Sequence, residues 1–446
     1  MTAVLLGGCG GTAESPAEST KQESTAESTK QENTAESTKT ESTAGGEETE
    51  TEDPAALVEL ASKDITGYLT EGAMHDDDIL LEADGVTLTA AEASFYMAYQ
   101  YYTAQNYYAG NGMTFNLTDK TPGGITYAEF MRQYAGVQAA RMLAAKACAA
   151  KEGVPLGEEA LSELAAFYED NYKSYGETRW YSELSAEMIA EEDFSEDEKN
   201  AWILEKGETA FRHSMLSMGT TPEAYYEYAE KYHYVTALQD YLYGENGANK
   251  LDDEALAARI DDYILENGVV WGRCILFKAM NLTEEEAEKL KTQAEETLHE
   301  LEGLSGDALA DRFTALQTQF DESGYTAGEI QMYTNSDSLV PGYYETLAAL
   351  PEGQVGLTDK TAYGWFVLLR EPSQPSLLTE TVKTQYINEE FSRVIDEYEA
   401  ASGIDPEQLI PEIDMERYYA RLDALGQALE EVDQVVSAHP AGEESK

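Results

Sequence analysis

The chain is poor in histidine, cysteine and basic residues. Its 446 residues include 5 His and 3 Cys, and 29 Lys and Arg stand against 86 Asp and Glu, for a net charge of −57. The scattered histidines form no zinc or catalytic-triad pattern. A surface this acidic repels nucleic acid and anionic lipid headgroups. The composition therefore excludes a nucleic-acid partner and favours basic or unfolded polypeptides.

Long apolar runs and nucleotide-binding motifs are also missing. No stretch is apolar for long enough to span a bilayer, and no P-loop, Gly-x-Gly-x-x-Gly or Gly-x-Ser-x-Gly motif occurs. The acidic run Met74–Asp78 is better interpreted as a solvated loop than as a cation site. Cys148 lies in an Ala-rich helical stretch and is expected to be buried and inert. We expect no disulfide framework, no metal and no cofactor.

What the N-terminus does contain is a short apolar run that ends in a cysteine. Val4-Leu5-Leu6-Gly7-Gly8-Cys9 resembles a bacterial lipobox, in which a Leu stands three residues before the Cys. The resemblance implies diacylglyceryl attachment to the Cys9 sulfur, and two acyl chains suffice for stable membrane binding. It also implies an extracytoplasmic location on the bacterial cell membrane. A chance Leu-Gly-Gly-Cys is the alternative.

A low-complexity segment follows this cysteine. Ala-Glu-Ser-Thr-Lys units begin at Ala17, Ala26 and Ala35, and residues 10–53 hold 12 acidic residues against 3 Lys. Because the segment has no aromatic or branched aliphatic residue, it cannot bury enough apolar area to offset the entropy of ordering. We predict a disordered acidic tether with a reach of roughly 35–40 Å.

The next region has the signals of a hairpin followed by long helices. Asp84-Gly85 is a two-residue turn signal between short apolar stretches, and Thr89 with Glu92 forms a capping box for a helix. Gly153 and Pro155 end a second long helix. Further helices are predicted over 157–173, 195–218 and 222–244. The Asp-Gly-x-x-Leu-Thr-x-x-Glu string resembles the entry of the SurA/PrsA-type chaperone domain.

Aromatic residues recur at helical spacing in the first long helix. Phe95, Tyr99 and Tyr102 fall on one face. Such a stripe indicates a core face, with a client-binding platform as the alternative. Near the C-terminus, helices are predicted over 378–401 and 413–435. The SurA/PrsA resemblance implies that the C-terminal segment packs back on the N-terminal helices, although the sequence assigns no partner to 413–435.

Between these helical parts lies a segment of different order. An apolar strand at 269–277 is followed by helices at 283–300 and 305–318, a short strand near 329–332, a helix at 342–349 and a strand at 363–370. This β-α-α-β-α-β order resembles a parvulin-type peptidyl-prolyl isomerase, over about a hundred residues.

The parvulin resemblance identifies candidate site positions, but two carry the wrong chemistry for the family. Cys274 and Phe366 stand where the family has histidines, and neither replaces a paired imidazole. Asp321 corresponds to the family's acid, and Leu339-Val340-Pro341-Gly342-Tyr343 to its apolar Met-x-Pro-x-Phe pocket segment. The resemblance thus implies degenerate catalytic positions at Cys274, Asp321 and Phe366, and substrate-binding positions at Leu339, Tyr343 and Met332.

Together these features predict a mostly helical α+β chain, in which a parvulin-like (FKBP-like) sheet-and-helix module is inserted into a split helical chaperone domain. The predicted parts are a signal-peptide remnant with the lipobox at 1–9, the tether at 10–55, an N-terminal chaperone domain at 56–250, the parvulin-like domain at 251–375, C-terminal helices at 376–435, and a disordered tail at 436–446.

The predicted function is that of a membrane-anchored foldase of the PrsA/SurA type. Its partners would be unfolded or newly translocated polypeptides, and a homodimer is left open. The parvulin-like domain would be a weak or inactive isomerase. The alternatives are an active peptidyl-prolyl isomerase and a solute-binding lipoprotein, which would need two α/β lobes.

Overall fold

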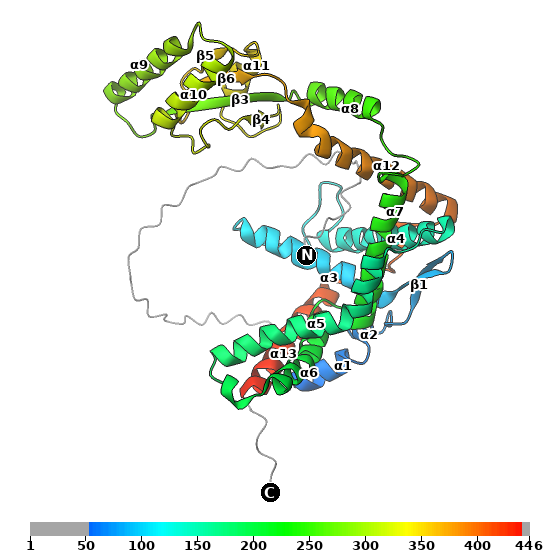
Figure 1. Cartoon of the computed structure of the whole chain (residues 1–446). Coiled ribbons are helices and arrows are strands. Elements are labelled where there is room, and N and C mark those ends of the chain that lie inside the picture. The colour runs from blue at the N-terminus through cyan, green and yellow to red at the C-terminus, as the bar shows by residue number, and fades with distance from the viewer. Residues whose placement is uncertain (1–52, 439–446) are drawn as a thin grey trace. The chain divides into compact units, whose positions relative to one another are not determined.

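The computed structural model describes residues 53–438, and the chain divides into two compact units (Figure 1). One unit is discontinuous: it comprises the chain up to Gly247 and the chain from Phe391 onward. The other, Ala248–Glu390, is inserted between those two segments. The fold is a mostly helical α+β fold with one two-stranded and one four-stranded sheet among the described residues. Cys9, nearly all of the predicted tether and the end of the predicted tail lie outside the described residues.

The discontinuous unit is helical apart from one hairpin. Its elements are α1 (Pro54–Ala61), α2 (Ile65–Leu69), β1 (Ile79–Ala83), β2 (Val86–Thr89), α3 (Ala90–Gly110), α4 (Tyr127–Glu152), α5 (Glu158–Ser185), η1 (Glu191–Asp193), α6 (Glu196–Ser217), α7 (Pro222–Tyr243), the second half of α12 (Thr379–Ser402), η3 (Pro406–Gln408) and α13 (Met415–Ala438). No described helix is long and apolar enough to cross a membrane.

Several helix limits differ from those predicted. α1 begins at Pro54, inside the range given to the tether, because Asp53 caps it and proline suits a first helical turn. α5 continues to Ser185, twelve residues past the predicted end. α13 runs to Ala438, beyond the predicted start of the tail.

The predicted hairpin and capping box are both present. β1 and β2 pair antiparallel around the Asp84-Gly85 turn, and both turn residues have positive φ. The Thr89 side chain accepts from the Glu92 backbone N–H, and Glu92 Oε2 accepts from the Thr89 N–H at 3.1 Å. The hairpin therefore leads directly into α3 with a fixed geometry.

The same Glu92 carries a buried ion pair. Its Oε1 accepts a 2.5 Å hydrogen bond from Lys231 Nζ on α7, and both side chains are almost completely buried. Burial raises the pKa of Glu92, while the Lys231 charge lowers it. One carboxylate thus caps α3 and joins it to α7.

Two glycines allow α5 and α6 to pack unusually closely. A Cβ placed on Gly176 would lie 1.9 Å from the Ile203 carbonyl oxygen, and one on Gly207 would lie 1.7 Å from that of Tyr172. No side chain fits at such distances, so only glycine permits this crossing.

The C-terminal helix α13 completes the core of the discontinuous unit. It packs against α1, α2 and α6. Tyr418 and Tyr419 are fully buried, and their hydroxyls donate to the carbonyls of Ser94 and Met97 on α3. The partner that the sequence could not assign is therefore the N-terminal part of the chain.

The second half of α12 contacts α4 through one arginine and two carboxyl groups. Arg141 Nη1 lies 2.6 Å from Asp396 Oδ1, and Glu399 is buried beside the same guanidinium. Glu399 Oε1 and Arg141 Nη2 have no hydrogen-bond partner. Burial raises the pKa of Glu399 to about 7, with the Asp396 charge adding to the rise and the Arg141 charge opposing it.

The inserted unit holds a four-stranded antiparallel sheet. Its elements are α8 (Asp253–Glu266), β3 (Val270–Lys278), α9 (Glu284–Leu301), α10 (Gly306–Phe320), β4 (Gln331–Tyr333), α11 (Tyr343–Ala349), β5 (Val355–Leu357), β6 (Gly364–Glu371), η2 (Pro375–Leu378) and the first half of α12. The strand order is β4-β3-β6-β5. The predicted order of elements is confirmed, with β5 added, and the unit ends at Glu390 instead of residue 375.

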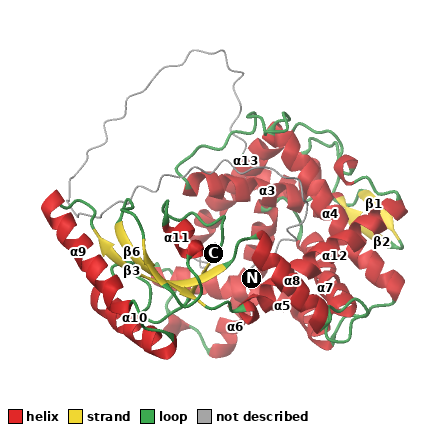
Figure 2. Ribbon diagram, turned by 90° about the horizontal axis from the view of Figure 1, so that it is seen from above, coloured by secondary structure: helices red, strands yellow, loops and turns green. Residues whose placement is uncertain are grey.

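The two faces of this sheet are covered by different helices. Ile275, Phe277 and Val367 pack with α9 and α10 on one face, whereas Cys274, Leu276 and Phe366 face α11 on the other. Figure 2 shows α10 and α11 on opposite sides of β3 and β6. Both faces are buried, so the strands read as continuous apolar runs instead of alternating ones.

Replacing Lys231 with Met should destabilise the chain by about 3–5 kcal/mol, because Glu92 is left buried without a counter-charge. Urea unfolding measures this loss. Lys173→Met on exposed α5 is the control and should change stability by less than about 0.5 kcal/mol. A loss below 1 kcal/mol for Lys231→Met would show that the pair is not a main support of this unit.

The stability of the chain should depend on Glu399 near neutral pH. A carboxyl whose pKa is raised in the folded state binds protons on folding. The free energy of unfolding of the chain should therefore rise as the pH falls from 8 towards 5. Glu399→Gln mimics the protonated form. It should therefore be more stable than the natural chain by about 1–2 kcal/mol at pH 8, by less at pH 5, and nearly equal to it at about pH 4. Equal urea midpoints at all three pH values would contradict this assignment.

Candidate functional site

The pairing of β3 with β6 brings the two histidine-equivalent positions together. Cys274 pairs with Leu368 and Leu276 pairs with Phe366, so all four side chains lie on the α11 face. Cys274 is 1% exposed and Phe366 is 6% exposed. Two residues that are 92 positions apart in sequence therefore share one buried cluster.

α11 and the loop before it cover this cluster. The ring centroid of Tyr343 lies 5.0 Å from that of Phe366, edge-on, and 5.3 Å from that of Tyr333. Tyr343 is 3% exposed, and Leu339 and Val340 pack against it at the rim. The predicted pocket residues Leu339 and Tyr343 thus lie beside Cys274 and Phe366.

A chain of hydroxyls and a thiol crosses the cluster. The Tyr343 hydroxyl donates to the Tyr333 hydroxyl at 2.8 Å, and the Cys274 thiol hydrogen-bonds with Tyr343 and Ser323. Asp321 Oδ2 accepts from the Ser323 hydroxyl at 2.5 Å, and its Oδ1 accepts from the Leu276 N–H at 2.7 Å. Asp321 therefore fixes the loop after α10 to β3.

Burial keeps the thiol and the two phenols of this network uncharged at neutral pH. It raises the pKa of the Cys274 thiol to about 11, and it raises the pKa values of Tyr343 and Tyr333 well above the usual range for tyrosine. A buried neutral thiol is a poor nucleophile. The one histidine of the inserted unit, His299, is exposed on α9 and pairs with Glu302 instead. The cluster contains no acid–base group that titrates near pH 7.

The structure places Met332 away from the cluster. In the sheet it pairs with Trp271, which lies on the opposite face from Cys274, and its neighbour Tyr333 takes the inward position. Sequence reasoning missed Tyr333 and Ser323. Tyr333 follows from the two-residue period of a strand once its register is known, whereas Ser323 lies in a loop with no local signal.

On the opposite face, Arg273 has a structural role. Its Nε donates to Glu371 Oε1 at 2.6 Å, its Nη1 donates to Thr314 Oγ1 at 2.8 Å, and the guanidinium lies over the Phe313 ring. Because the Arg273 side chain lies on the opposite face of β3, it does not lower the pKa of Cys274.

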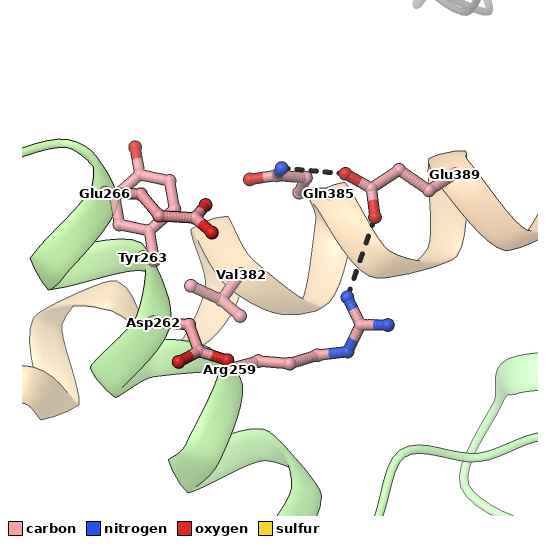
Figure 3. A pocket seen from close by; sticks show the side chains of 7 residues that line it. All are labelled: Arg259, Asp262, Tyr263, Glu266, Val382, Gln385 and Glu389. Atoms are coloured by element: carbon pink, nitrogen blue, oxygen red, sulfur yellow. Dashed lines mark hydrogen bonds and ion pairs between the residues drawn. The ribbon is translucent and has the colours of Figure 1, made fainter.

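A surface hollow of about 390 Å³ lies between α8 and the first half of α12 (Figure 3). Arg259 pairs with Glu389 at 3.6 Å across it, and the Tyr386 ring lies over the same guanidinium. Asp262, Tyr263, Glu266, Val382 and Gln385 complete the lining. These contacts describe a polar junction of two helices. Within residues 53–438, no group of three metal-ligating side chains converges.

Comparison with known proteins finds distant structural similarity and no match in sequence. No family model matches the sequence, and no curated protein does. Among solved structures, the chain is similar to a SurA-like chaperone of Campylobacter jejuni, from work on PEB4 and Cj1289, at 19% identity over 47% of this chain and 84% of that one, with a TM-score of 0.19.

Two PrsA structures also match. PrsA from Bacillus subtilis aligns at 12% identity over 83% of this chain and 95% of its own, with a TM-score of 0.19. The foldase PrsA from Streptococcus pneumoniae aligns at 13% identity over 80% and 98%, with a TM-score of 0.21. At these scores the matches carry no argument about function, which must come from the chain's own residues.

The cluster should be sensitive to loss of one hydroxyl. Tyr343→Phe leaves the Cys274 thiol and the Tyr333 hydroxyl each short of a partner, so unfolding should become easier by about 1–3 kcal/mol. In a background with Cys9→Ser and Cys148→Ala, Cys274 should also react faster with a thiol reagent at pH 8. Tyr363→Phe, on an exposed ring, is the control and should change neither. Unchanged thiol reactivity in Tyr343→Phe would show that this hydroxyl does not protect Cys274.

Proposed function

We propose that this chain is a foldase of the PrsA/SurA type that holds unfolded or newly translocated polypeptides outside the cytoplasm. The observation that carries the proposal is a parvulin-like sheet, β4-β3-β6-β5, inserted between two segments of one helical unit. That is the arrangement implied by the sequence resemblance. Its module keeps the family's element order while its site positions hold Cys274, Tyr343 and Phe366.

We further propose that the inserted unit does not accelerate proline isomerisation. The peptide C–N bond has a rotational barrier of ~18–20 kcal/mol that comes from amide resonance. A catalyst must admit the prolyl ring to a pocket and stabilise the twisted amide. Here Tyr343 and Phe366 fill the centre of the cluster and Cys274 is 1% exposed. A prolyl ring reaches the thiol only if Tyr343 or the Leu339 loop moves.

The membrane attachment in this proposal rests on the sequence. The lipobox-like Val4–Cys9 and the acidic repeat after it supply an acyl anchor and a tether of roughly 35–40 Å reach. Reversible holding of a client needs no nucleotide, which suits an extracytoplasmic compartment. The solute-binding alternative gains no support, because the described elements outside the inserted unit are helices and one hairpin, not a second α/β lobe.

Two assays on the full chain test the proposal. The chain should suppress light scattering by reduced, unfolded lysozyme at near-equimolar ratios, and it should leave the rate of a protease-free peptide isomerisation assay at the uncatalysed value. Uncatalysed exchange takes tens to hundreds of seconds, so acceleration is easily seen. Failure to suppress scattering would reject the foldase. Acceleration that is lost in Tyr343→Ala, with the fold checked by circular dichroism, would establish the active isomerase instead.

A further inference from the structure

One part of this acidic chain is almost free of charge. Residues 93–128 contain a single acid, Asp119, and a single base, Lys120. At the chain's average of 86 acidic residues in 446, a stretch of this length would hold about seven. Aromatic residues are dense in it instead. The segment comprises most of α3 and the whole connection to α4.

This segment ends in an exposed apolar surface. The first half of α3 is buried as far as Tyr101, but Tyr107 near its end is 61% exposed. In the connection, Met113 is 49% exposed and Ile125 is 36% exposed, and Phe130 in the first turns of α4 is 42% exposed. Figure 1 shows the end of α3, in cyan, projecting from the other helices of its unit. We call Tyr107, Met113, Ile125 and Phe130 the neutral tip.

Three aromatic rings close to the neutral tip residues in the sequence hold the end of α3, the connection and the start of α4 together. The Tyr108 hydroxyl donates to that of Tyr127 at 3.1 Å, and the Phe115 ring lies 5.2 Å from Tyr108 and 5.6 Å from Tyr127. The connection is also tied to itself, since the Tyr127 N–H donates to the Asp119 carbonyl. A surface held in place before binding loses little entropy when it binds.

The net negative charge of the chain restricts which partners can bind the neutral tip. Single exposed apolar residues are normal, but several at one junction mark an interaction site. The Tyr108–Tyr127 hydrogen bond joins the end of α3 to the start of α4, and all four residues of the neutral tip lie within five positions of it in the sequence. A second copy of the chain brings another −57 charge, and an anionic membrane is repelled in the same way. An apolar polypeptide segment without net negative charge meets no such repulsion, and Lys or Arg beside it is attracted by the net negative charge of the chain.

We propose that the neutral tip is the surface through which the chain grips apolar segments of unfolded polypeptides that are neutral or cationic. The proposal rests on the foldase function and assigns its client contact. It also assigns the two interpretations of the aromatic residues of α3, a core face and a client-binding platform, to different parts of the helix. Phe95 and Tyr101 belong to the core, whereas the end of the same helix presents Tyr107 outward.

Peptide binding by the full chain tests the assignment. The probe is a fluorescent 20-residue peptide of alternating Leu, Phe and Ser with two Lys at each end, and its partner has Asp in place of Lys. The triple variant Tyr107→Ser, Met113→Ser, Phe130→Ser should bind the Lys peptide at least about tenfold more weakly, which corresponds to about 1.4 kcal/mol. The natural chain should bind the Asp peptide more weakly than the Lys peptide, by a margin that shrinks with salt.

A matched control replaces three equally exposed apolar residues elsewhere in the same unit. Ile79→Ser, Leu161→Ser, Tyr181→Ser should bind the Lys peptide within twofold of the natural chain. Unfolding midpoints of both triples should equal that of the natural chain. If the tip triple unfolds early, the single loop variant Met113→Gln replaces it, with an expected loss of about threefold.

The outcomes separate this proposal from the foldase function. Natural-strength peptide binding by the tip triple, in a chain that suppresses lysozyme aggregation, overturns the tip and leaves the foldase standing. A natural chain that neither binds peptide nor suppresses aggregation rejects both. Two other outcomes would also overturn the proposal, provided that the tip triple still binds peptide. If the tip triple loses self-association in sedimentation, the tip binds a second copy of the chain. If it loses binding to phosphatidylcholine vesicles, the tip binds lipid.

Discussion

The helical unit depends on one buried charge pair. Glu92 belongs to the first turn of α3, where its carboxylate accepts a hydrogen bond from the N–H of Thr89, the N-cap residue. The same carboxylate pairs with Lys231 of α7, and both side chains are buried away from water. Removing two charges from water is costly, so such a pair persists only where its geometry is tightly held. It fixes the start of α3 against α7. The direction of the rest of α3, including its exposed end, is set by that contact.

In the inserted unit the corresponding constraint is the register of β3 with β6. The register decides that Cys274 and Phe366 face α11 while Arg273 faces α10. The result is a cluster of parvulin-like layout whose polar atoms are hydroxyls and a thiol. Hydroxyls satisfy one another in a closed, neutral core, whereas imidazoles would bring a proton that titrates near physiological pH. Burial keeps the thiol and the phenols of this cluster neutral.

Local patterns were sufficient for much of this structure. The Asp84-Gly85 turn, the Thr89–Glu92 capping box and the Gly153 C-cap are each decided by a few neighbouring residues, and each is present. The convergence of Cys274 with Tyr343 required the family layout as well. What could not be predicted depends on distant partners. The inward side chain of β4 is Tyr333 instead of Met332 because the register pairs Met332 with Trp271, on the face away from Cys274. Likewise, nothing in the sequence around Gly176 indicates the Ile203 carbonyl that packs against it.

The discontinuity of the helical unit has a consequence for how the chain folds. A chain that emerges N-terminus first presents α1 and α3 long before α13, whose Tyr418 and Tyr419 fill the core against them. The inserted unit, continuous from Ala248 to Glu390, has all its strands available earlier. Contacts that close such long loops form late. A protein of this design must therefore keep its own apolar helices from aggregating until its last helix is available, and a high net negative charge helps because unfinished chains repel one another.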